Sequence, residues 1–93
     1  MTANQQHEAG VVQAILEQLE QHTLPRTVDI RARVDAGERL ADSDTQFLEE
    51  VLQGLRRDGP YVQHHPEWEP LYSRIIDLYD QITRRALENE QRR

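Results

Sequence analysis

The sequence contains no cysteine and no lysine, and only five of its 93 residues are aromatic. Without cysteine, disulfide scaffolds, cysteine-ligated metal centres and cysteine nucleophiles are excluded. No apolar run approaches the roughly 18 residues that a membrane-spanning helix needs. Residues 1–10 also lack the basic start and the apolar stretch of a signal peptide. We therefore expect a cytoplasmic protein that has no membrane partner.

Acidic residues outnumber basic ones, 17 to 11, which gives a formal net charge of −6. This sign disfavours direct binding of nucleic acid, because nucleic-acid-binding proteins neutralise phosphates with an excess of basic side chains. The acidic surface suggests an alternative function, an inhibitor that mimics nucleic acid and blocks the basic groove of another protein. The carboxylates that would imitate phosphates are Asp42, Asp44, Glu49, Glu50, Asp77 and Asp80.

Apolar residues in the first quarter of the chain recur every three or four positions, which is the period of an amphipathic helix. These residues are Val11, Val12, Ile15, Leu16 and Leu19. We predict a helix over 8–23. It should end before Leu24-Pro25, because a proline disfavours the helical backbone in the residue that precedes it.

The next segment, 26–37, is ambiguous. Its apolar residues Val28, Ile30, Ala32 and Val34 alternate with charged ones, which is the period of a strand. No other stretch resembles a strand, however, and a single strand would leave its backbone groups unpaired. We therefore predict a short helix here, which starts just after a proline and ends at a glycine.

A third helix is predicted over 43–58. Ser43 and Gln46 have the spacing of a capping box at its start. The dipeptide Gly59-Pro60 supplies a stop at its end, because proline cannot continue the backbone hydrogen bonding of a helix.

A fourth and long helix is predicted over 68–90, after a connector bounded by prolines. Together these segments predict an all-α protein with a single helical domain over 1–93, whose polar ends, 1–7 and 91–93, fray. The short connections favour antiparallel neighbours. We therefore predict a small four-helix bundle made of two antiparallel helical hairpins, with a core that dimerisation would complete.

The last predicted helix carries the most informative pattern. Its apolar residues have coiled-coil spacing and cover about 180° of the helix, from Leu78 round to Ile76 and Leu87. One flank of a bundle needs only about 100°. The excess predicts a protein interface, with a second copy in a homodimer or another protein as the partner. Its residues are Trp68, Leu71, Tyr72, Tyr79 and Tyr61, with Arg84 and Arg85 as rim charges.

Residues suited to catalysis or metal binding are few. His64 and His65 lie near Glu67, but neither Glu-x-x-His nor His-Glu-x-x-His, the spacings of helical metal sites, occurs. The four glycines are isolated, so no phosphate-binding loop is present. Of the two serines, Ser43 has the position of a helix cap and Ser73 lies on the polar face of the last helix, so neither is a candidate nucleophile. We therefore predict a non-enzymatic interaction protein with no catalytic residue, no metal site and no cofactor. A metal-binding helical protein is the second alternative.

Overall fold

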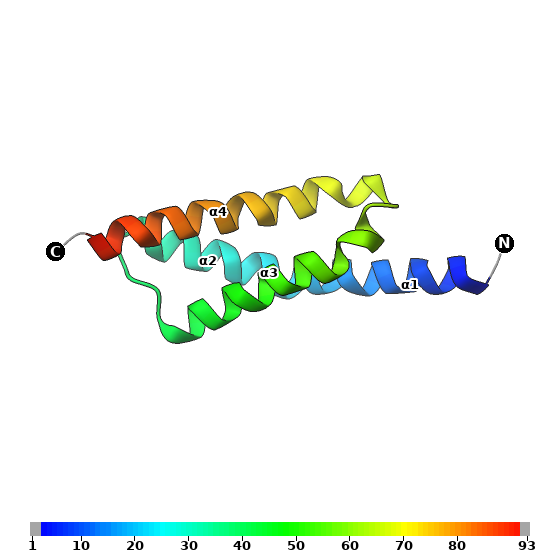
Figure 1. Ribbon diagram of the computed structural model, residues 1–93, viewed down its shortest axis with the longest axis horizontal. Helices are drawn as coiled ribbons and strands as arrows, with labels where there is room; N and C mark the ends of the chain where they lie inside the picture. The colour runs from blue at the N-terminus through cyan, green and yellow to red at the C-terminus, as the bar shows by residue number, and fades with distance from the viewer. Residues whose placement is uncertain (1–2, 92–93) are drawn as a thin grey trace.

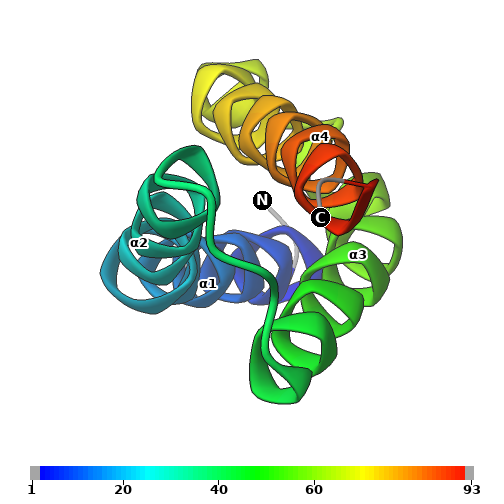
Figure 2. The same ribbon diagram turned by 90° about the vertical axis from the view of Figure 1, so that its left-hand side faces the viewer.

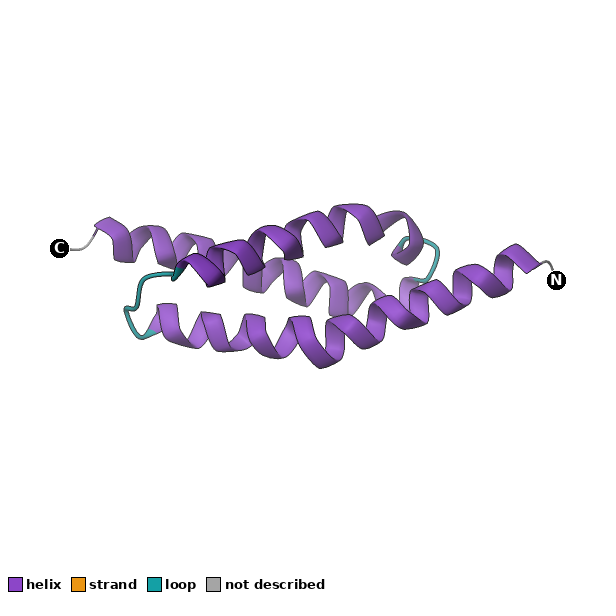
Figure 3. Ribbon diagram, turned by 90° about the horizontal axis from the view of Figure 1, so that it is seen from below, coloured by secondary structure: helices purple, strands orange, loops and turns teal. Residues whose placement is uncertain are grey.

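The computed structural model of the protein describes residues 3–91. Within this range the chain is almost entirely helical and contains no strand (Figure 3), so the all-α prediction is confirmed. The elements are α1 (Ala3–Gln18), a π-helical segment η1 (Leu19–Thr23), α2 (Leu24–Asp35), α3 (Asp42–Val62), a short 3-10 turn η2 (Pro66–Trp68) and α4 (Glu69–Gln91). The ends that were predicted to fray include residues 1–2 and 92–93, which lie outside the described residues.

The molecule is elongated, with extents of 59 × 21 × 19 Å. The chain runs along the long axis through α1 and α2, returns along α3 and runs out again along α4 (Figure 1). Viewed along that axis, α2, α3 and α4 surround a common centre, with α1 continuing behind α2 (Figure 2). The first part of α1 extends beyond the turn between α3 and α4 (Figure 1). None of the helices in residues 3–91 is both long and apolar enough to cross a membrane.

The predicted break at Leu24-Pro25 is wrong, because the helix continues from 3 to 35 through η1. The Leu24 N–H donates to the Leu19 carbonyl, five residues back, as in a π-helix. In a regular α-helix the Pro25 ring would clash with the carbonyl of Gln21. The wider π turn accommodates the proline without ending the helix. The described residues therefore hold three long helical stretches, where four helices in two hairpins were expected.

The start predicted for α3 agrees with the observed Asp42 within one residue, but the predicted cap and the predicted end are wrong. Ala41, and not Ser43, is the N-cap, and the carboxylate of Asp44 accepts a hydrogen bond from the Ala41 N–H at 3.0 Å. At the other end the helix passes through Pro60 and ends at Val62. Because Pro60 lies in the last turn, its missing N–H removes one bond near a terminus and does not break the helix.

The core consists of two apolar clusters along the long axis. The π cluster joins η1, α3 and α4, and the α2 cluster joins α2, α3 and α4. The members of the π cluster are Leu19, Val51, Leu55 and Ile75; those of the α2 cluster are Ile30, Val34, Leu48, Ile82 and Ala86. Phe47 packs against both. The core therefore draws on one stripe of each helix, as expected for amphipathic helices.

Polar side chains join the helices at the end of the bundle where α2 leads into α3. Asn89 of α4 is buried, and its amide nitrogen donates to the carbonyls of Val34 and Glu38, each at 2.9 Å. These carbonyls belong to the end of α2 and to the connector that follows it, so Asn89 attaches the C-terminal part of α4 to both. Gly37, with φ +94°, provides the left-handed turn after α2 that glycine adopts most easily.

Candidate interface on the last helix

The aromatic edge of α4 is used largely inside the protein. Leu71 and Tyr72 are half-buried and pack against the π cluster, and Tyr79 is half-buried against the α2 cluster. The Tyr72 hydroxyl donates a hydrogen bond to the carbonyl of Leu55 in α3. Burial, and then the nearby charge of Asp58, raises the pKa of this hydroxyl. Tyr72 therefore joins α4 to α3 within one protein molecule.

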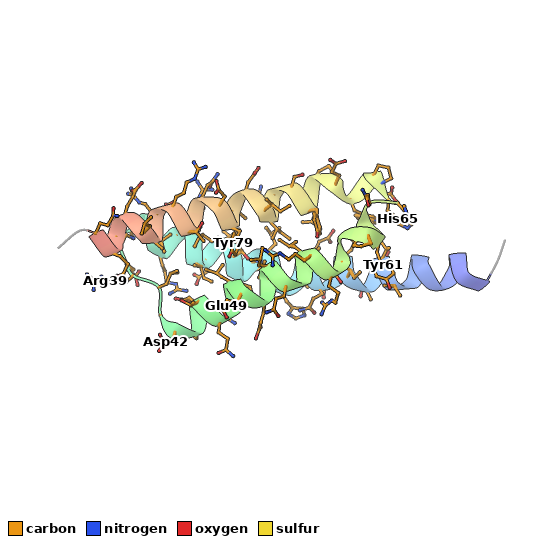
Figure 4. All side chains as sticks on the ribbon, viewed as in Figure 1. Arg39, Asp42, Glu49, Tyr61, His65 and Tyr79 are labelled. Carbon is orange, nitrogen blue, oxygen red and sulfur yellow. The ribbon has the colours of Figure 1, made fainter. Side chains whose placement is uncertain are left out.

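Tyr61 and Trp68 lie near the turn between α3 and α4. Tyr61 is 39% exposed near the end of α3, and Trp68 is half-buried in η2. Tyr61 and His65 are both found at this end of the molecule (Figure 4). The predicted interface residues therefore divide into a half-buried row along α4 and an exposed tyrosine beside the turn.

A different row on α4 presents large apolar side chains to solvent. Ile76 is 44% exposed and Leu87 is 60% exposed, and between them lie the exposed residues Asp80 and Thr83. Their spacing of 4, 3 and 4 places all four within an arc of about 60° on the helix. We call Ile76, Asp80, Thr83 and Leu87 the outer stripe of α4.

The sequence-based interface did not include Ile76 and Leu87, although both lie at one edge of the apolar arc. The arc gave their angular position on the helix. It did not indicate which edge would be covered by α2 or α3, and this depends on tertiary packing. The covered part of the arc runs from Leu78 through the aromatic residues, so the exposed apolar surface is left at the edge formed by Ile76 and Leu87.

The two predicted rim arginines differ in their surroundings. Arg84 is exposed and pairs with Asp80 of the outer stripe at 3.2 Å. Arg85 is half-buried, and one of its terminal nitrogens donates to Glu88 at 2.9 Å. Its Nε is buried without a hydrogen-bond partner, as is the Oδ1 of Asn89 one turn further along. Arg84 is therefore the rim charge of the outer stripe, whereas Arg85 belongs to the buried polar end of α4.

The six carboxylates proposed for nucleic-acid mimicry do not form one free surface. Asp44 is buried and receives two hydrogen bonds from Arg33, at 2.7 and 3.0 Å. The hydrogen bonds from Arg33 hold the pKa of this carboxyl below its usual range. Asp80 is occupied by Arg84. Asp42 and Glu49 are exposed and lie along α3 (Figure 4), and Glu50 and Asp77 are exposed as well.

Groups for metal binding or acid–base chemistry do not converge in the described part of the chain. Within it, no three histidine, aspartate or glutamate side chains come together in a way that would hold a metal ion. His65 Nδ1 lies 3.6 Å from a carboxylate oxygen of Glu67, and Glu67 is exposed. This contact belongs to the turn in which Pro66 leads into α4.

A half-open groove of about 350 Å³ runs between α1, η1 and α3. Its floor is apolar and includes Ile15, Leu19 and Val51. At its rim the carboxylate of Asp58 pairs with Arg57 at 3.1 Å. The groove therefore offers contact surface for an apolar group, without a nucleophile and base arranged for catalysis.

Comparison of the chain with protein-family models, with curated proteins and with solved structures gives no match. The function must therefore be inferred from the geometry and chemistry of the residues themselves.

Proposed function

We propose that the protein is a non-enzymatic interaction module, a small regulatory or accessory helical protein that binds a protein partner through α4. The observation that carries the proposal is the exposure of Ile76 and Leu87 on one side of the same helix. Large exposed apolar residues that are grouped on one face favour a protein contact, whereas scattered ones do not. The partner is a second copy of the chain, another protein, or both in turn.

The attachment of α4 to the rest of the molecule supports this role. Tyr72 bonds to the Leu55 carbonyl near one end of the helix, and Asn89 bonds to two carbonyls near the other. Ile75 and Ile82, between these attachments, are fully buried. A helix held in this way presents its outer stripe in a fixed arrangement, which reduces the entropic cost of binding a partner.

The two alternatives have less support. Mimicry of nucleic acid needs free and regularly spaced carboxylates, whereas Asp44 is buried against Arg33 and Asp80 is paired with Arg84. A metal-binding function needs converging ligands, and the described residues provide no group of three. The apolar outer stripe therefore remains the best-supported basis for function.

Photo-crosslinking tests the proposal directly. The photoreactive amino acid benzoylphenylalanine would replace Leu87 in one variant and, as a matched control, Val28 in another, because Val28 is 41% exposed on α2. Irradiation in cells is expected to join position 87 to a defined polypeptide, either a second copy or another protein, and position 28 to none. The absence of a product from position 87, or the same products from both positions, would contradict the proposal.

A further inference from the structure

We propose that the occupant of the outer stripe is a second copy of this chain, with the two α4 helices antiparallel about a two-fold axis. The inference rests on the proposed function, because it uses the same surface, and it adds the identity, orientation and register of the partner. Two-fold dimers are the commonest symmetric assemblies, and their interface must be complementary to itself. The outer stripe meets that condition in both its apolar and its charged residues.

The apolar residues of the stripe define the register. Ile76 and Leu87 are 11 residues apart, about 16 Å along the helix, and lie within about 20° of each other around it. When two such helices run antiparallel with the axis midway between these positions, each Ile76 meets the partner's Leu87. Two apolar contacts then form, one on each side of the axis, and both exposed side chains of each copy are covered.

The charged residues agree with the same register. Asp80 and Arg84 lie on one flank of the stripe, and a two-fold axis perpendicular to the helices brings this flank against its own copy. Each Asp80 then lies across from the partner's Arg84, offset by only about 1.5 Å along the axis. Each carboxylate lies between two guanidinium groups, its own at 3.2 Å and that of the partner. The interface is therefore electrostatically complementary to itself.

The surface of the protomer is large enough to leave room for such a contact. A compact monomer of 10.9 kDa exposes about 5,600 Å² by the size scaling of folded proteins. This chain exposes 6495 Å², and its radius of gyration is 15.4 Å, against about 12 Å for a compact domain of this length. This excess of roughly 900 Å² belongs to the whole elongated protomer, including the part of α1 that extends beyond the bundle (Figure 1), so the outer stripe supplies only a share of it.

Complementary charge substitutions test the pairing. Asp80→Arg gives a chain with arginine at both positions, and Arg84→Asp gives a chain with aspartate at both. In a homodimer of either variant, positions 80 and 84 of the two copies carry like charges and repel each other across the axis. The dimer dissociation constant, measured by sedimentation equilibrium, is therefore expected to rise about tenfold or more. An equimolar mixture of the two variants should form a heterodimer with an affinity near that of the unchanged protein, because every cross-axis pair is then attractive.

A control tests whether any charge reversal on the surface has this effect. Glu17 of α1 is exposed and accepts a hydrogen bond from Gln13, four residues earlier, at 3.4 Å. Glu17→Arg should leave the dimer unchanged, and circular dichroism should show that all variants keep their helicity. A chain that stays monomeric would overturn the inference. So would a dimer whose dissociation constant is unchanged by both charge substitutions. If position 87 crosslinked to a different protein while this chain stayed monomeric, a second copy would be ruled out as the occupant of the outer stripe. The proposed function would still stand.

Discussion

Arg33 of α2 holds Asp44, in the first turn of α3, through two hydrogen bonds of 3.0 and 2.7 Å. The two terminal nitrogens of the guanidinium donate to the two carboxylate oxygens, the bidentate arrangement that gives strong ion pairs. The Asp44 side chain is only 5% exposed, whereas Arg33 retains 34% of its surface. Asp44 also accepts the Ala41 N–H at 3.0 Å. This pair therefore fixes the start of α3 against α2.

Asp44→Asn should destabilise the fold by about 2 kcal/mol at neutral pH. The substitution removes the carboxylate charge and one acceptor, and it leaves the guanidinium of Arg33 without its buried partner. Asp29→Asn is the matched control, since Asp29 bonds the same arginine at 3.2 Å but is 69% exposed. The control should cost less than about 0.5 kcal/mol. Urea unfolding of the three proteins measures both values, and equal losses would show that burial of Asp44 has no effect.

The same pair predicts a pH dependence. The pKa of Asp44 is lower in the folded protein than in the unfolded chain, so its contribution is fully present above the ordinary aspartate pKa of about 3.9. The contribution is lost as the pH falls through the lower, folded-state pKa. The difference in unfolding free energy between the unchanged protein and Asp44→Asn should be constant from about pH 7 to about pH 5 and shrink below about pH 4. A difference that stays constant at acid pH would contradict this assignment.

Asn89→Leu should loosen the end of the bundle where α2 leads into α3. Asn89 is 4% exposed, and the substitution removes the donor that the carbonyls of Val34 and Glu38 share. We expect a loss of about 2 kcal/mol and faster amide hydrogen exchange in residues 36–41. Glu90→Leu, at an exposed neighbour, is the control and should leave exchange in this segment unchanged. Unaltered exchange in Asn89→Leu would show that the connector does not depend on this side chain.

Two glycines should respond to alanine in opposite ways. Gly54 lies inside α3, where an added Cβ would make only an ordinary contact, 3.7 Å from a terminal nitrogen of Arg57. Gly54→Ala should therefore stabilise the protein by about 0.5–1 kcal/mol, because alanine loses less backbone entropy in a helix. Gly37 has φ +94°, so Gly37→Ala should destabilise it by about 1–2 kcal/mol. Thermal unfolding measures both shifts, and a lower melting temperature for Gly54→Ala or a higher one for Gly37→Ala would contradict the corresponding assignment.

The sequence predicted α4 almost to the residue, 68–90 against the observed Glu69–Gln91, because a long apolar period dominates local signals. It failed at Pro25, which locally indicates a helix end. Buried residues lie on both sides of this proline, Leu19 and Thr23 before it and Thr27 after it, so tertiary packing favours continuation through η1. The contact of Arg33 with Asp44 also could not be predicted, since it joins two helices across a connector. For the candidate site, the apolar arc placed the predicted interface on α4, and the packing of the neighbouring helices determines which part of that arc is exposed.

Disulfide trapping tests the outer stripe as a two-fold interface most directly. The described chain has no free cysteine, and the full sequence contains none, so introduced thiols report without background. In the proposed register position 76 meets the partner's position 87, whereas two copies of position 76 lie about 16 Å apart along the axis, too far for a disulfide. Mixing Ile76→Cys with Leu87→Cys should therefore give a rapid intermolecular disulfide, and either variant alone should give little. Equal crosslinking in the mixture and in the separate variants, or none in any of them, would contradict the account.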